Sequence, residues 1–167
     1  MKINNINDMN FTEIERKFLI DPTKIPYDLS TIEYCDIIQG YASTNFELIY
    51  RLRKSEYSNE DIEYYQTIKG KGTKIRKEVE TELTEEQFDD MWIACEDITL
   101  EKRRYKTGTD VYDLDQYKGV LAPLWTVEVE FDTIESCDNF TPPKWFGEEV
   151  TEDVRYTNLN LAINGLP

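Results

Sequence analysis

Apolar and polar residues alternate with a period of two along most of this chain, and that period is typical of β-strands. Eight segments show it, at 12–20, 36–43, 46–54, 61–69, 74–83, 99–106, 110–117 and 123–132. Gly70-Lys71-Gly72 and Lys106-Thr107-Gly108-Thr109 stand between neighbouring segments and have the composition of hairpin turns. Eight mostly antiparallel strands with few helices predict a mainly β fold, either a barrel or a sandwich.

Helical periodicity is limited to short segments. The clearest is 84–97, where Thr84 can cap the first turn and Phe88, Met91, Trp92 and Cys95 form an apolar stripe. Weaker helical patterns occur at 133–139 and 157–164. Residues 1–10 include four asparagines and few apolar side chains, which predicts a flexible N-terminal extension. Since no linker interrupts the remainder, residues 11–167 should form a single domain.

The composition excludes several classes of function. The chain has 34 acidic and 19 basic residues and a formal charge of −15, so its long-range field repels nucleic acids and anionic membranes. It contains no histidine, which excludes Ser-His-Asp and Cys-His mechanisms and every histidine-ligated metal site. A bound metal would therefore be held by carboxylates, as hard cations such as Mg²⁺ or Mn²⁺ are.

The cysteines and the hydropathy indicate a cellular compartment. Cys35, Cys95 and Cys137 are far apart and odd in number, so they predict neither a CxxC metal site nor a closed disulfide framework. The sequence has no apolar run of 18 residues, and its first ten residues lack the apolar region of a signal peptide. These features predict a cytoplasmic protein with no membrane association.

Charged residues of the predicted strands occur in rows of one sign. Residues i and i+2 of a strand lie on the same face about 7 Å apart. Arg51 and Arg53 form one such row, and Glu128 and Glu130 form another. These rows have two interpretations: they line the solvent face of an antiparallel sheet, or they face a ligand of opposite charge in a closed barrel whose apolar surface is outside. Since like charges at i and i+2 repel, the segregation of the rows favours the second.

The rows supply equal numbers of bases and acids. The bases are Lys17, Arg51, Arg53, Lys69, Arg76, Lys102 and Arg104, and the acids are Glu13, Glu15, Glu78, Glu80, Asp115, Glu128 and Glu130. A barrel lumen with these residues would be neutral but strongly polarised. A linear triphosphate carries roughly −4 to −5 near neutral pH, and two divalent cations would balance most of that charge. The charge pattern therefore favours a complex of metal and polyphosphate as the guest.

The first of these rows carries a family resemblance. Glu13-Ile14-Glu15-Arg16-Lys17 resembles the ExExK signature of the CYTH superfamily, the triphosphate tunnel metalloenzymes. Further motifs follow in the order of the family: Gln39-Gly40-Tyr41, Arg51-Leu52-Arg53, Thr67-Ile68-Lys69, Arg76-Lys77-Glu78-Val79-Glu80, Glu101-Lys102-Arg103-Arg104-Tyr105, Leu114-Asp115 and Glu128-Val129-Glu130-Phe131. The tail from Pro142 to Asp153, with Arg155-Tyr156, is similar to that of the short bacterial inorganic triphosphatases.

The resemblance implies an eight-stranded antiparallel β-barrel tunnel with a charged lumen and a few flanking helices over residues 11–167. It implies that two Mg²⁺ or Mn²⁺ ions are held by Glu13, Glu15, Glu128 and Glu130, with Asp115, Glu78 and Glu80 assisting. The phosphates would contact Lys17, Arg51, Arg53, Lys69, Arg76, Lys102 and Arg104. Lys17 and Tyr41 resemble the pair that activates water in the family.

The activity implied is metal-dependent hydrolysis of inorganic triphosphate (tripolyphosphate) to pyrophosphate and phosphate. Alternatives on the same tunnel are a class IV-type adenylate cyclase, a thiamine, RNA or nucleoside triphosphatase, and a non-catalytic polyphosphate or nucleotide sensor. The negative exterior disfavours nucleic acid, apart from an RNA 5′ end, and a homodimer is compatible with the acidic, aromatic-rich surface.

The role of Lys17 has two readings. In a cationic tunnel, Arg51 and Arg53 would lower the pKa of Lys17 and allow it to act as a base; otherwise Lys17 is a simple phosphate contact.

Overall fold

The computed structural model of the chain describes residues 12–42, 47–107 and 112–167. The predicted N-terminal extension, residues 1–10, lies outside the described residues, as do parts of the predicted strands 36–43, 46–54 and 110–117. The strands are β1 (Thr12–Ile20), β2 (Tyr34–Tyr41), β3 (Leu48–Tyr57), β4 (Ile62–Gly70), β5 (Ile75–Leu83), β6 (Thr99–Lys106), β7 (Tyr112–Tyr117), β8 (Trp125–Glu130) and β9 (Phe146–Glu149). The α-helices are α1 (Glu85–Trp92), α2 (Ile134–Asn139) and α3 (Asn158–Asn164).

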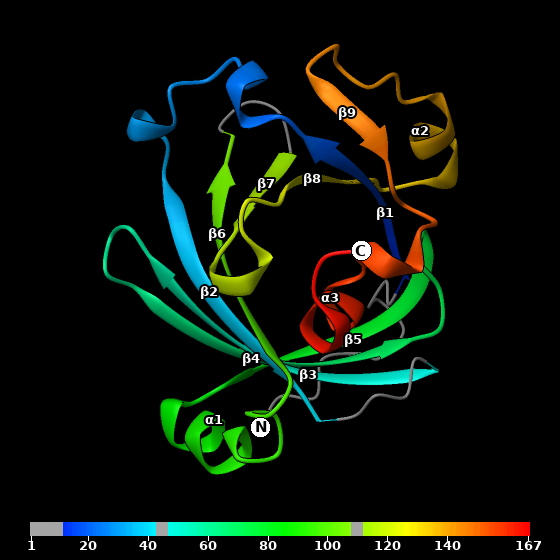
Figure 1. The fold of residues 1–167 in the computed structure, drawn as a ribbon. Helices are drawn as coiled ribbons and strands as arrows, with labels where there is room; N and C mark the ends of the chain where they lie inside the picture. The colour runs from blue at the N-terminus through cyan, green and yellow to red at the C-terminus, as the bar shows by residue number, and fades with distance from the viewer. Residues whose placement is uncertain (1–11, 43–46, 108–111) are drawn as a thin grey trace.

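Eight of these strands form a closed antiparallel barrel, which Figure 1 shows as a ring. The order is β5-β4-β3-β2-β6-β7-β8-β1, and a further pairing of β1 with β5 closes it. At the closure Glu13 of β1 stands opposite Arg76 of β5, and farther along β1 Lys17 stands opposite Glu128 of β8. The prediction of an eight-stranded antiparallel barrel is confirmed.

The ninth strand was not predicted. β9 pairs with the second half of β1, outside the barrel, through Phe18 and Glu149. Its four residues, Phe146–Glu149, are too short to show a period and three of them are exposed. Helix α1 has the predicted capping box of Thr84 and Gln87, but it ends at Trp92, whereas the prediction extended to residue 97.

Two of the three apolar core clusters of the described residues lie on the outer side of the barrel wall. On one side Phe18, Leu114 and Val127 point outward and are covered by aromatic side chains, among them Phe140 and Phe146. On another side α1 packs Phe88 against Leu52 and Tyr64 of β3 and β4, together with Cys95. Because these strands turn their apolar side chains outward, their charged side chains are left for the lumen. Cys35, Cys95 and Cys137 are buried and free.

The C-terminal segment lies across the lumen rather than on the outer surface. In Figure 1, α3 lies within the ring of strands. Leu161 of α3 packs against Leu100 and Tyr117 of the barrel wall, and the Tyr117 hydroxyl donates to Asn158 Oδ1 at 2.6 Å. The segment therefore contributes to the wall of the internal cavity. No helix in the described part of the chain is long and apolar enough to cross a membrane.

Candidate active site

The barrel encloses a cavity of about 920 Å³. Its charged lining is balanced, with nine basic and nine acidic side chains: Lys17, Arg51, Arg53, Lys69, Lys71, Arg76, Lys102, Arg104 and Lys106, and Glu13, Glu15, Glu47, Glu78, Glu80, Asp113, Glu128, Glu130 and Asp153. Thirteen of the fourteen charged residues predicted for the site are among them, and Tyr41 also lines the cavity. Asp115 does not. The alternation in the sequence therefore predicted 13 of these 18 charged side chains.

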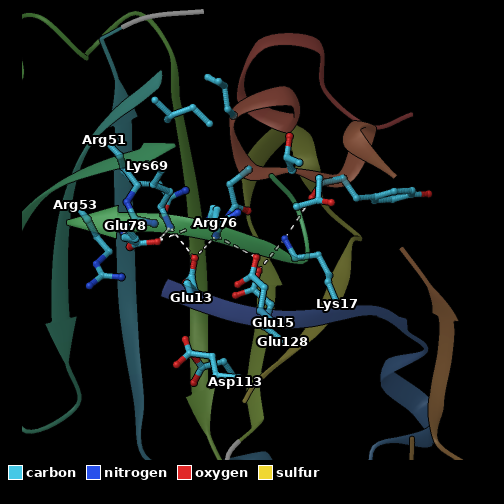
Figure 2. A pocket seen from close by; sticks show the side chains of 18 of the residues that line it. Glu13, Glu15, Lys17, Arg51, Arg53, Lys69, Arg76, Glu78, Asp113 and Glu128 are labelled. Carbon is cyan, nitrogen blue, oxygen red and sulfur yellow. Dashed lines mark hydrogen bonds and ion pairs between the residues drawn. The ribbon is translucent and has the colours of Figure 1, made fainter. Parts of the chain in front are cut away.

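One cluster surrounds Arg76, where β1 meets β5 (Figure 2). Arg76 Nη2 lies 2.6 Å from Glu13 Oε2 and 3.0 Å from Glu15 Oε1. Lys69 Nζ donates to Glu78 Oε2 at 2.5 Å and lies 3.6 Å from Glu13 Oε2. Three carboxylates thus converge on two cations.

A second cluster joins Lys17, Glu128 and Arg104. Lys17 Nζ lies 2.7 Å from Glu128 Oε1 and donates to the Tyr156 carbonyl at 3.2 Å. Arg104 Nη2 donates to the other oxygen of Glu128 at 2.6 Å, and its Nη1 donates to Asp113 at 2.5 Å. Strands β1, β6, β7 and β8 and the C-terminal segment therefore meet at this cluster.

A third cluster contains the two arginines of β3. Arg51 Nη2 donates to Thr67 Oγ1 at 2.8 Å and to Glu80 Oε2 at 3.1 Å. Arg53 Nη2 donates to the other oxygen of Glu80 at 3.2 Å. A single carboxylate thus lies between two guanidinium groups.

Several buried polar atoms of these clusters have no hydrogen-bond partner. Within the described residues they are the Nε atoms of Arg51, Arg53 and Arg76, Glu13 Oε2 and, on β8, Thr126 Oγ1. Glu13 Oε2 is close to Arg76 but lacks hydrogen-bond geometry. Buried groups are normally hydrogen-bonded, so a group of unpaired guanidinium donors in one cavity indicates a site for an anion.

The ionisation of the site reflects its mixed charges. Burial raises the pKa of Glu15 to about 7, although the positive charge of Arg76 acts to lower it. Burial also opposes the charge of Glu13, but Lys69 and Arg76 outweigh it and lower the pKa of Glu13 to about 2. Burial, with Arg51 and Arg76 nearby, lowers the pKa of Lys69 to about 8.

The predicted depression of the Lys17 pKa is wrong. Burial does favour the neutral amine, but the carboxylate of Glu128 outweighs it and raises the pKa of Lys17 above its ordinary value. The reason is the register: Lys17 lies opposite Glu128, not beside Arg51 or Arg53.

Lys17 and Tyr41 face the same cavity but have different partners. The Tyr41 hydroxyl accepts a hydrogen bond from Gln39 Nε2 at 2.6 Å, and burial raises the pKa of Tyr41 to about 12. The described residues include no hydrogen bond between Lys17 and Tyr41.

Among the parts of the lining that were missed, which also include Glu47 and Lys71, three are informative. Asp113 faces the cavity one pleat from Asp115, and Lys106 continues the row of Lys102 and Arg104. Both follow the same period of two, so the signal was present in the sequence. The third part, from Val150 to Leu159, has no such period and lines the cavity from the C-terminal segment.

The donors available for a metal are all carboxylates, as a hard cation requires. Glu13, Glu15, Glu128 and Glu130 face the cavity, and one oxygen of Glu13 has no hydrogen-bond donor. The donor chemistry therefore fits Mg²⁺ or Mn²⁺. Within the described ranges, however, no three acids are grouped closely enough to form a ready metal site, and the acids pair with lysines and arginines instead.

The chain is similar in sequence to two inorganic triphosphatases. No family model matches the chain. The inorganic triphosphatase of Nitrosomonas europaea is 39% identical over 157 residues, which cover 92% of this chain and 98% of that protein. The inorganic triphosphatase of Acetivibrio thermocellus is 30% identical over 156 residues, or 91% of this chain and 94% of that protein.

Solved structures show the same architecture. The crystal structure of the inorganic triphosphatase NE1496 superposes with a TM-score of 0.64 at 36% identity, covering 93% of this chain and 97% of that one. A putative adenylate cyclase from Bacillus halodurans superposes with a TM-score of 0.50 at 14% identity, covering 77% of this chain and 86% of that one. The second likeness concerns the fold alone.

Proposed function

Since the chain belongs to the inorganic triphosphatase family of the CYTH superfamily, we propose that it hydrolyses inorganic triphosphate to pyrophosphate and phosphate inside its barrel, with Mg²⁺ or Mn²⁺. The observation that carries the proposal is the group of three arginines whose buried Nε atoms have no acceptor, in a cavity lined by acidic and basic side chains in equal number. A polyphosphate supplies acceptors, and the acids supply ligands for the cations that accompany it.

The bases of the cavity bind and orient the phosphate chain. Transfer of a phosphoryl group asks the protein mainly to position the reactants and to neutralise charge. The planar guanidinium groups of Arg51, Arg53 and Arg104 suit phosphate oxygens because they donate two parallel hydrogen bonds and stay charged. Lys17, Lys69, Arg76 and Lys102 add positive charge from the other strands.

The acids hold the metal in this proposal. Glu13, Glu15, Glu128 and Glu130 are the ligands, with Glu78 and Glu80 close by, and two ions would be accommodated. The ions, when bound, neutralise phosphate charge and make a water molecule more acidic. The same acids now pair with Lys17, Arg76 and Arg104, so binding of phosphate to these bases would release carboxylates for the metal.

The test is phosphate release from tripolyphosphate, ATP, thiamine triphosphate and 5′-triphosphorylated RNA, each with Mg²⁺ or Mn²⁺, and cyclic AMP is measured in the ATP reactions. We expect release from tripolyphosphate to be fastest and to stop with EDTA. Faster release from an organic triphosphate, or formation of cyclic AMP, would replace the proposed substrate. Binding of tripolyphosphate without release from any substrate would make the chain a polyphosphate sensor.

Lys17 acts as a cation rather than as a base in this proposal. Its ammonium donates to the Tyr156 carbonyl and pairs with Glu128, and both interactions hold the proton on the nitrogen. We expect Lys17→Arg to keep kcat within about tenfold of the wild type, while Lys17→Met lowers it by about 100-fold, as loss of a charge-stabilising donor does. A kcat for Lys17→Arg as low as that for Lys17→Met would show an essential lysine base; a steady-state phosphate assay decides.

A further inference from the structure

Asp115 is the predicted site residue that the cavity excludes. Its exposed fraction is 0%, whereas Asp113, two residues earlier on the same face of β7, lines the cavity. The carboxylate lies behind two bases of the lining, Lys102 and Arg104, which come from the adjacent strand β6.

Both oxygens of Asp115 are occupied by these two bases. Oδ2 accepts from Lys102 Nζ at 2.5 Å and from Arg104 Nη2 at 2.7 Å. Oδ1 accepts from Arg104 Nε at 2.7 Å. Three short charge-assisted hydrogen bonds therefore hold a lysine and an arginine side chain in one arrangement.

The contacts divide the donors of Arg104 between two sides. Its Nε and Nη2 edge meets Asp115, away from the cavity, whereas Nη1 meets Asp113 and Nη2 also meets Glu128, which both line the cavity. Lys102 is 2% exposed, so it has little freedom to leave its carboxylate. Asp115 thus holds Nε and shares Nη2 with Glu128, while Nη1 contacts an acid that lines the cavity.

We infer that Asp115 is a positioning residue: it orients Lys102 and Arg104 for the phosphate chain and does not itself touch metal or phosphate. This inference rests on the proposed function for the identity of the anion. Lysine and arginine have many rotamers, and holding them in the bound arrangement beforehand reduces the entropy lost on binding. Arg104 needs the second anchor because Asp113 and Glu128 compete for the edge that faces the cavity.

The critical variant is Asp115→Asn, measured by the KM for tripolyphosphate at saturating Mg²⁺ and by the Mg²⁺ concentration that gives half-maximal rate. We expect KM to rise about 10–100-fold, as when an orienting partner of a ligand is lost, with a smaller change in kcat and no change in the Mg²⁺ requirement. The substitution removes a negative charge beside Lys102 and Arg104, which by charge alone would lower KM, so a rise in KM identifies lost orientation. A raised Mg²⁺ requirement with unchanged KM would overturn the inference and make Asp115 a metal ligand.

The outer face of the barrel provides a matched control. Asp36 accepts from Arg103 Nε at 2.9 Å, from Arg103 Nη2 at 2.7 Å and from Lys118 Nζ at 2.5 Å. This is the same chemistry as around Asp115, on the side that faces away from the cavity. Asp36→Asn should leave KM unchanged, and an equal rise in both variants would mean that the Asp115 effect is general to the fold.

A double-mutant cycle and a crystal structure complete the test. If Asp115 acts through Arg104, adding Asp115→Asn to Arg104→Ala should raise KM far less than Asp115→Asn alone; additive effects would contradict the inference.

Should Asp115→Asn not fold, Lys102→Met/Asp115→Asn avoids the unpaired ammonium and tests Arg104 alone. A crystal structure of the folded variant should show Arg104 in a new rotamer, and an unmoved Arg104 would overturn the inference even if the enzyme proved to have another substrate.

Discussion

Replacing Glu13 and Glu15 together by glutamine is expected to lower Mg²⁺-dependent phosphate release from tripolyphosphate by at least about 1000-fold, because in the proposed function both are ligands of a catalytic cation. The two side chains lie on the same face of β1, 2.6 and 3.0 Å from Arg76 Nη2. Glutamine keeps the shape of each side chain but does not hold a divalent cation as a carboxylate does. Phosphate release over a range of Mg²⁺ concentrations measures the effect.

The double variant should fold. Burial raises the pKa of Glu15 to about 7, so near neutral pH this side chain is partly uncharged in the wild type and glutamine resembles that form. Glu13 is charged, with a pKa lowered to about 2, and its replacement leaves Arg76 with Glu78, at 3.7 Å, as its ion-pair partner. Glu149→Gln is the matched control. Glu149 of β9 accepts two hydrogen bonds, of 2.8 and 2.6 Å, from Arg16, which lies on β1 like Glu13 and Glu15 but on the outer side. Glu149→Gln should keep wild-type activity. Full activity of Glu13→Gln/Glu15→Gln, with circular dichroism like that of the wild type, would place the metal on other acids.

The barrel and its lining were predictable because the period of two assigns each side chain to a face. Once one face of Glu128-Val129-Glu130 is charged and the other apolar, closing the sheet leaves only the choice of which face is inside. The segregation of charge by sign indicated the lumen, and the structure places thirteen of the fourteen predicted charged residues there.

The same period does not specify whether a side chain on the inner face reaches the cavity or is buried in its wall. Asp113 and Asp115 belong to one face, and nothing in the sequence shows that Asp113 reaches the cavity while Asp115 is sealed behind Lys102 and Arg104. The local sequence pattern also does not predict which residues on other strands a side chain pairs with. Lys17 was placed by its charge beside arginines, but the register of β1 and β8 sets it opposite Glu128, and that reverses the direction of its pKa shift.

Arg51 should show the largest effect among the phosphate-binding residues. It is 6% exposed, its Nη2 is held by Thr67 and Glu80, and its Nε is buried with no acceptor. An unsatisfied buried donor costs about 1–3 kcal/mol, more for a charged group, and a phosphate oxygen would remove that cost on binding. Arg51→Ala loses both the charge and this gain, so we expect kcat/KM for tripolyphosphate to fall by about 100–1000-fold.

The form of the guanidinium can be separated from its charge. Arg51→Lys keeps the charge but loses the planar pair of donors. We expect its kcat/KM to be only about tenfold higher than that of Arg51→Ala. Arg103→Ala is the control, because Arg103 makes a comparable two-point contact with Asp36 on the outer face of the barrel. Tripolyphosphate should raise the Tm of the wild type and of Arg103→Ala, but raise that of Arg51→Ala much less. Equal shifts in all three proteins would mean that the anion does not contact Arg51, and the unpaired Nε would then be a cost of the fold rather than part of the site.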